Sequence, residues 1–174
     1  MVSSFSLQHR LARAAWNMTW LLLCRWTPRP LHAWRALVLR VWGAKIGERT
    51  HVYPGAIIWA PWQLTLGDDA CIADGAEIYN VAPITLGVRA VVSQDAYLCA
   101  ASHDHRQADF PMTCAPITLG DRAWVAARAI VLPGITIGAG AVAGAGSVVT
   151  RDIPEGCTAA GNPARIVRQA ESGK

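Results

Sequence analysis

Aliphatic residues recur every six positions between Ile46 and Val149, and this period limits the fold more than any other feature of the chain. An α-helix repeats its apolar residues every three or four positions and a half-buried β-strand every two, so neither explains the pattern. Hexapeptide repeats are typical of a parallel β-helix, in which three hexads close one triangular coil of about 18 residues. We therefore predict an all-β fold, a parallel β-helix of about five coils with the aliphatic side chains inside. The aliphatic positions are Ile46, Val52, Ile58 and Leu64; Leu66, Ile72, Ile78 and Ile84; Leu86, Val92 and Leu98; and Leu119, Val125, Val131, Ile137, Ala143 and Val149.

A small residue follows many of these positions at an interval of four, where it would fit a tight corner of the coil. Glycine comes directly after several aliphatic residues, and there we expect the backbone to turn with no room for a Cβ. The small residues are Ala70, Ala76, Ala82, Ala90, Ala96, Ser102, Ala123, Ala129, Ala141 and Ser147, and the glycines are Gly67, Gly87, Gly120 and Gly138.

One long segment interrupts the repeat. The spacing between Leu98 and Leu119 fits no whole number of hexads, so we expect residues 102–116 to leave the coils as a protruding loop. A strict solenoid with a single long excursion usually carries functional residues there. The predicted domains are an N-terminal helical segment at 1–44, a β-helix at 45–155 that includes the loop at 102–116, and a C-terminal tail at 156–174.

The N-terminal segment shows helical spacing in two stretches, which are separated by residues 27–30 and followed by Gly43 as a candidate C-terminal cap. Residues 1–50 hold eight basic residues and one acidic residue, whereas residues 51–174 hold eight basic and eleven acidic ones. The basic character therefore belongs to the helical segment. Its apolar run at 14–24 is shorter than the ~20 residues that span a bilayer.

Two interpretations of this segment stay open, and they are compatible on different helix faces. The helices could cap the open end of the β-helix, as terminal repeats require. Alternatively, the tryptophans that alternate with arginine, Trp16, Trp20, Trp26 and Trp34, could lie in a membrane interface. No nucleic-acid-binding motif accompanies the basic residues, so we expect no nucleic-acid partner.

The cysteines indicate the compartment. The five of them are scattered and form no CxxC motif, which is typical of reduced thiols in a cytoplasmic protein. We therefore predict a cytoplasmic protein, and the membrane interpretation would place it at the inner membrane surface.

His103 is the strongest candidate for a general base, because histidine exchanges protons near neutral pH. It ends a hexad, where a rigid strand can hold a catalytic side chain in place. Asp104 could orient His103, although adjacent residues often point apart. His105 stands two residues further into the loop, so we expect it to be more mobile and not catalytic.

The same loop could also ligate a metal ion through His103, Asp104, His105 and Asp109. Some hexapeptide-repeat proteins bind zinc between subunits, but such sites need three converging histidines. The only other histidine of the predicted β-helix is His51, in its first coil and far from the loop. We therefore predict no metal.

Several runs resemble the hexapeptide-repeat acetyltransferases that use acetyl-CoA. Residues 117–149 and the run AAGNPAR at 159–165 look like the signature of that family. A narrower branch, the O-acetyltransferases of colanic acid and exopolysaccharide synthesis, is similar to maltose and galactoside acetyltransferases. The runs that resemble this branch are WTPRP at 26–30, IWAPW at 58–62, YNV at 79–81 and SHD at 102–104. The resemblance covers nearly the whole chain and implies a left-handed β-helix and a homotrimer with active sites between subunits.

The resemblance also implies roles for single residues. His103 matches the family's catalytic base, and Asn80 matches a residue that lines the acceptor site. Small side chains would let the pantetheine arm of coenzyme A lie against the backbone, and arginine would bond to its phosphates. The positions that match coenzyme A contacts are Ala127, Ala145 and Thr150 on the prism wall, and Arg165 and Arg168 near the phosphates. The family often has glycine where this chain has Ala126 and Ala127.

These residues predict an acetyl-CoA-dependent O-acetyltransferase that acts on the hydroxyl of a free or lipid-linked sugar in exopolysaccharide biosynthesis. Two alternatives stay open. One is a zinc hydratase of the carbonic-anhydrase type on the same fold, which metal analysis would identify. The other is a non-catalytic trimeric scaffold, which would release no thiol from acetyl-CoA.

Overall fold

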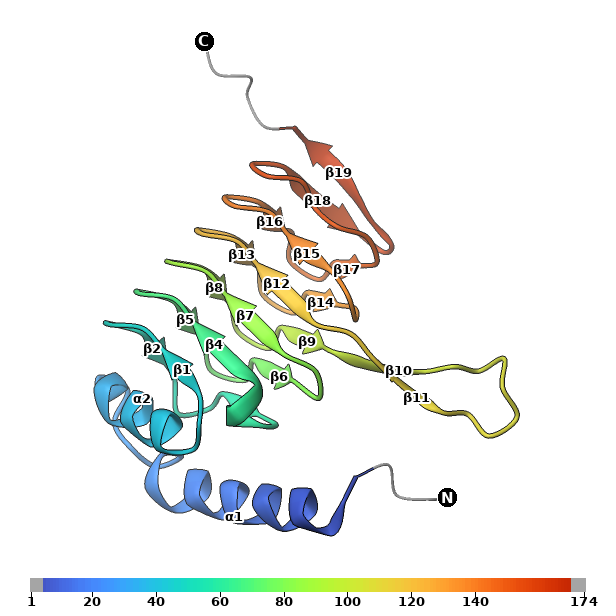
Figure 1. Ribbon diagram of the computed structural model, residues 1–174. Coiled ribbons are helices and arrows are strands. Elements are labelled where there is room, and N and C mark those ends of the chain that lie inside the picture. Colours follow the sequence, from blue (N-terminus) through green and yellow to red (C-terminus); the bar gives the residue numbers. More distant parts are fainter. Residues whose placement is uncertain (1–4, 170–174) are drawn as a thin grey trace.

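The computed structural model describes residues 5–169 and shows a triangular parallel β-helix with two helices at its N-terminal end (Figure 1). Five complete coils stack along the axis, and a partial sixth follows them. The predicted all-β architecture is therefore confirmed. The period of six residues produces it because each short strand is followed by a tight corner.

Three sheets form the faces of the prism, and strands of successive coils pair in parallel along each face. Face A comprises β1 (Lys45–Ile46), β4 (Leu64–Leu66), β7 (Ile84–Leu86), β12 (Ile117–Leu119) and β15 (Thr136–Ile137). Face B comprises β2 (His51–Val52), β5 (Cys71–Ile72), β8 (Val91–Val92), β13 (Trp124–Val125), β16 (Val142–Ala143), β18 (Thr158–Gly161) and β19 (Ala164–Arg168). Face C comprises β3 (Ile57–Ile58), β6 (Glu77–Tyr79), β9 (Tyr97–Cys99), β14 (Ile130–Val131) and β17 (Val148–Val149). A short 3₁₀ helix, η1 (Pro61–Gln63), connects the first coil to the second.

The aliphatic residues of the hexads fill the interior, as predicted. Leu66 lies beside Leu86, and Leu86 beside Leu119, so side chains of successive coils stack directly on one another. All three are almost completely buried. Burying one such side chain contributes about 1.5–3 kcal/mol, so the column of aliphatic residues is the main source of stability.

The glycines that follow the aliphatic residues allow the coils to approach one another. A Cβ on Gly67 would lie 2.7 Å from the backbone carbon of Gly87, closer than real Cβ contacts. The predicted small corner residues are also buried, with two exceptions. Ala82 is half-buried, and Ser102 is exposed because it has already left the prism.

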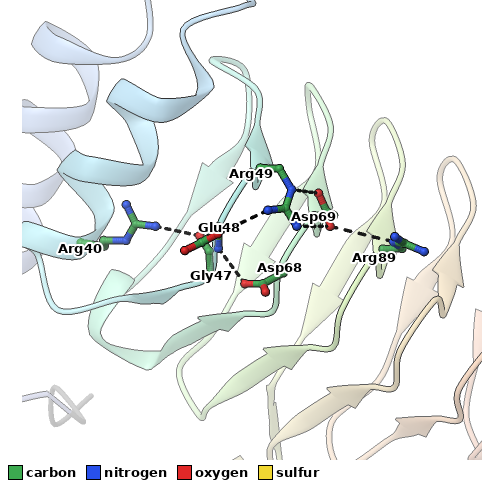
Figure 2. A network of polar contacts seen from close by, with 7 residues as sticks. All are labelled: Arg40, Gly47, Glu48, Arg49, Asp68, Asp69 and Arg89. Carbon is green, nitrogen blue, oxygen red and sulfur yellow. Dashed lines mark hydrogen bonds and ion pairs between the residues drawn. The ribbon is translucent and has the colours of Figure 1, made fainter.

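Edge AB, where the chain turns from face A to face B, carries a network of charged side chains (Figure 2). Arg49 of the first coil pairs with Asp69 of the second at 2.8 Å, and Asp69 also approaches Arg89 of the third. Arg40 donates to the carbonyl oxygen of Gly47 and so joins the helical segment to the same edge. Exposed ion pairs contribute little individually, so this network orders the edge more than it stabilises the fold.

The two helices, α1 (Leu7–Leu23) and α2 (His32–Val41), cap the first coil. The Trp16 indole donates to the Ile58 carbonyl oxygen at 2.7 Å, and the buried Arg35 donates to the Val52 carbonyl oxygen at 2.6 Å. Gly43 ends α2 with a positive φ, which is the predicted cap. The capping interpretation is therefore confirmed. Within residues 5–169, neither helix is long and apolar enough to cross a membrane.

The predicted loop is a β-hairpin rather than an irregular excursion. Its strands, β10 (Ala101–His103) and β11 (Met112–Cys114), pair in antiparallel fashion and project from the prism (Figure 1). The predicted tail also differs in part. β18 continues face B as a further rung, and β19 folds back antiparallel onto it, so an ordered hairpin follows residue 156.

Candidate active site

His103 is the last residue of β10, at the point where the hairpin strands separate. Its Nδ1 lies 2.9 Å from the carbonyl oxygen of Phe110, and its ring stacks on the Phe110 ring with centroids 4.8 Å apart. A carbonyl oxygen can only accept, so Nδ1 carries the hydrogen and donates it. The lone pair of Nε2 is then free. This is the tautomer that a general base needs, and the stacked ring holds its orientation.

Asp104 and His105, the other candidate residues of the loop, do not contact His103 through a hydrogen bond. The Asp104 carboxylate accepts hydrogen bonds from the Arg106 backbone at 3.0 Å and the Gln107 amide at 2.8 Å. These bonds lower the pKa of Asp104, the Gln107 bond most, and fix the turn. The Phe110 carbonyl, and not Asp104, therefore bonds to His103. His105 is exposed in the turn beyond β10.

Ala127 and Ala145 occupy equivalent places on edge BC, where the chain turns from face B to face C. Val125 pairs with Ala143, so the residues two positions further lie one above the other. The Gly146 N–H donates to the Ala127 carbonyl oxygen at 2.9 Å, which joins the two corners. Ala127 is half-buried and Ala145 is exposed, so this stretch of the edge is open and lined by small side chains.

Arg165 belongs to the same edge, because β18 extends face B by one rung. Ala159 pairs with Ala143, and Arg165 of β19 pairs with Ala160. Arg165 is exposed, and it lies beside β18, the rung that follows the coil of Ala145. The fold thus brings together three of the predicted coenzyme A residues.

The remaining predicted coenzyme A residues lie elsewhere. Arg168 pairs with Thr158, at the other end of β18. Thr150 is exposed and follows β17, so it lies on edge CA, where the chain turns from face C to face A. The coenzyme A contacts of all five residues stay predictions.

Asn80 is completely buried at the corner that follows β6. Its amide oxygen accepts from the Ala60 N–H at 2.9 Å, and its amide nitrogen donates to the Ala60 carbonyl oxygen at 2.6 Å. The side chain therefore replaces a backbone partner and joins the first two coils. Contact between Asn80 and an acceptor stays a prediction.

Face C carries a row of aromatic side chains that extends from the first coil to the third, where the hairpin begins. The sequence interpretation did not assign them to the site. Trp59 and Tyr79 have ring centroids 5.6 Å apart, Tyr79 and Tyr97 6.3 Å, and the Arg13 guanidinium covers the Trp59 ring at 3.8 Å. Burial raises the pKa of both tyrosines, so their hydroxyls stay protonated and able to donate. Flat rings with hydroxyl donors suit a ligand that has both apolar and polar faces. The signal in the sequence is the spacing of one coil between Trp59 and Tyr79, whereas Tyr97 pairs with Glu77 and lies two positions from that column.

His103 and the coenzyme A corner do not meet within one chain. The hairpin leaves the prism on edge CA, after β9, whereas Ala127 and Ala145 lie on edge BC. Face C separates these edges. A site that combines His103 with this corner therefore needs residues from two chains.

A pocket beneath α1 is not part of this arrangement. It has a volume of about 590 Å³ and lies beneath α1, where Trp16, Trp20, Arg25 and Asp74 line it together with the first coils. Neither His103 nor the predicted coenzyme A residues line it. Within residues 5–169, no three His, Cys, Asp or Glu side chains lie close enough together to hold a metal ion.

No family model matches the chain. It is 41% identical over 144 residues to the Escherichia coli K12 protein named "Putative colanic acid biosynthesis acetyltransferase WcaF", and the match covers 83% of this chain and 79% of that protein. A maltose O-acetyltransferase of Clostridium difficile 630 superimposes with a TM-score of 0.86 at 26% identity, covering 96% and 90% of the two chains. A galactoside acetyltransferase in complex with coenzyme A gives a TM-score of 0.86 at 25% identity, covering 96% and 84%. The chain therefore belongs to the hexapeptide-repeat acetyltransferases, enzymes with a left-handed β-helix, and to the branch that includes WcaF.

Proposed function

We propose that this protein transfers the acetyl group of acetyl-CoA to a saccharide hydroxyl during exopolysaccharide biosynthesis. The relative WcaF is named for colanic acid biosynthesis, and the two superimposed enzymes are named for maltose and galactoside. The observation that carries the proposal is His103, which ends β10 with Nδ1 bonded to the Phe110 carbonyl oxygen and Nε2 available.

The reaction is a direct transfer. A sugar hydroxyl is far too weak an acid to lose its proton to imidazole in advance, since the reference pKa of histidine is about 6.5. Nε2 of His103 therefore accepts the proton while the hydroxyl oxygen attacks the thioester carbon. Backbone N–H groups of an adjacent coil hold the developing oxyanion. When the carbon–sulfur bond breaks, the imidazolium returns the proton to the departing thiolate.

An acyl-cysteine intermediate has little support. Cys99 donates its S–H to the Ala101 carbonyl oxygen at 3.0 Å, and no general base accepts that hydrogen. Burial raises the pKa of the Cys114 thiol. The nucleophile of such a route is the thiolate, so neither cysteine is activated.

The proposed active unit is a homotrimer whose sites lie between subunits. Edge BC of one chain supplies the coenzyme A corner, and the hairpin of its neighbour supplies His103. The separation of these two features within one chain supports the arrangement. The proposed acceptor is a saccharide, either free or attached to a lipid, and the proposed location is cytoplasmic, at the inner face of the membrane.

Acceptor-dependent release of thiol from acetyl-CoA tests the function. Purified protein is incubated with acetyl-CoA and a panel of mono- and oligosaccharides, and products are analysed by mass spectrometry for the gain of one acetyl group. We expect thiol release only with a saccharide acceptor. A protein that releases no thiol with any acceptor would instead fit the scaffold alternative, and hydration of carbon dioxide by a zinc-containing preparation would fit the hydratase.

A further inference from the structure

Helix α1 is apolar on two opposite sides. One side is buried against the first coil through Trp16, Trp20 and Cys24. The other side presents Leu7, Leu11, Met18 and Leu22, which follow one another at helical spacing and are 55–67% exposed. An apolar side of a helix is normally buried, so the outer side of α1 lacks the partner that its composition calls for.

The exposed apolar residues concentrate on the helical segment. Eleven of the seventeen large hydrophobic side chains that are exposed in residues 5–169 lie between Leu7 and Val41. They include Trp26, which is 81% exposed in the connection between the helices. Contiguous apolar patches of this kind mark interaction surfaces on proteins. We call the outer side of α1, together with Trp26, the helical face.

The charge of the segment indicates the kind of partner. No acidic residue precedes Glu48 in the sequence. The exposed basic residues of the helical segment and of its junction with the first coil are Arg10, which lies on α1 itself, and Arg25, Arg29, Arg40 and Lys45. Arg29 pairs with Asp74, but Arg40 donates to the backbone carbonyls of Ile46 and Gly47, which leave its positive charge unbalanced. The segment therefore complements a negatively charged surface.

An anionic membrane complements both the apolar outer side of α1 and the positive charge of the segment. A second copy of this chain would complement only the apolar side. Two helical faces packed together would bury their leucines but bring like charges close to one another. A helix that lies in the interfacial plane buries its apolar side among the acyl chains and leaves basic residues at the phosphate groups. Tryptophan such as Trp26 is typical of this depth.

We propose that the helical face docks the enzyme on an anionic lipid bilayer. The inference rests on the proposed function in one respect, since lipid-linked acceptors would be reached there. The contacts themselves are independent of the acetyl transfer.

Vesicle sedimentation of the full-length protein tests the docking. The probes are vesicles of phosphatidylcholine alone and of phosphatidylcholine with phosphatidylglycerol. We expect binding to the anionic vesicles, partial release at high salt because the Debye length falls, and a remaining salt-insensitive part from the buried leucines. The double variant Leu11→Glu with Met18→Glu should reduce the vesicle partition coefficient at least about tenfold, since each change removes an inserted apolar side chain.

A matched control adds a negative charge elsewhere. Val88→Glu replaces an exposed apolar residue on edge AB and should leave vesicle binding unchanged. Acetyl transfer to a soluble acceptor should be unchanged in the double variant, so a failure of docking and a failure of the proposed function are distinguishable. Absence of binding to anionic vesicles at low salt would overturn the inference. So would a double variant that binds normally, or one whose subunits separate in sedimentation, which would assign the helical face to a contact between copies.

Discussion

A single backbone carbonyl gives His103 its proposed role. The Phe110 oxygen accepts the Nδ1 hydrogen, so Nε2 is left as the basic nitrogen at the exposed end of β10. Neither the neighbouring carboxylate of Asp104 nor the neighbouring imidazole of His105 takes part in that bond. The two histidines of the hairpin therefore differ in mechanical support rather than in residue type.

Substitution of the two histidines should separate their roles. His103→Ala should lower kcat by roughly 10²–10⁴, the usual contribution of a general base, and leave acetyl-CoA binding nearly intact. His105→Ala is the matched control and should stay within a few-fold of the unmodified protein. Steady-state kinetics and calorimetric titration with acetyl-CoA measure both effects. A dead His105→Ala variant beside an active His103→Ala variant would contradict the assignment.

The arginines of β19 provide a second test at this scale. Arg165→Ala and Arg168→Ala should weaken coenzyme A binding more than binding of an analogue that lacks a phosphate, because a charge-assisted bond to that phosphate is lost. Titration of both ligands against each variant gives the comparison. Equal losses for the two ligands would place these side chains away from the phosphates.

At the scale of the secondary-structure element, the corners of the β-helix set its tolerance to substitution. Gly67 and Gly140 both lie on edge AB, but a side chain is unfavourable at the two positions for different reasons. A Cβ on Gly67 would meet the backbone of the next coil, whereas a Cβ on Gly140 would meet nothing within 4 Å. Gly140 instead has a φ of +62°, which L residues adopt with some strain.

These two glycines predict different costs. Gly67→Ala should lower the free energy of unfolding by about 3 kcal/mol, because the coils must move apart. Gly140→Ala should cost only about 1 kcal/mol, the penalty of a left-handed conformation. Urea unfolding at one protein concentration measures both changes. Equal costs would show that backbone conformation, and not the spacing of coils, decides tolerance along this edge.

The sequence predicts the elements better than the site. Each aliphatic residue of a hexad has only one inward place, so the period alone assigns positions such as Leu66 and Leu86 to the interior. The hand of the coil has no such signal, because either hand gives the same period, and only the family resemblance implies it. The bond between His103 and Phe110 depends on the register in which β10 pairs with β11, and the connecting residues 104–111 contain no glycine turn that would fix this register in the sequence. The aromatic column of Trp59 and Tyr79 is detectable from its spacing of one coil.

At the scale of the whole molecule, the two parts of the proposed active site lie on different edges of the prism. The hairpin leaves on edge CA, and the coenzyme A corner lies on edge BC. One chain therefore holds both halves of the proposed site without joining them. A closed ring of three chains can place each hairpin beside a neighbouring corner.

Hybrid trimers test that division directly. His103→Ala removes the base, and Ala145→Trp fills the coenzyme A corner, so each variant alone should be inactive. If sites are shared, random assembly of equal amounts makes about three quarters of the trimers hybrid, each with one intact site of three. About a quarter of the unmodified activity should then return after co-expression, measured as thiol release. Mixtures that stay inactive would show that each site belongs to one chain.

The elements that cover the two ends of the β-helix also prevent molecules from adding to one another end to end. A coil binds the next one through backbone groups on all three faces, so an uncovered terminal coil is a template for further addition. Here α1 and α2 cover the first coil, and β19 turns antiparallel onto β18 at the other end. Without the helices, the exposed strand edges of the first coil could pair with those of another molecule and begin a fibre. The N-terminal helices therefore act as a stop against polymerisation, whatever else they bind.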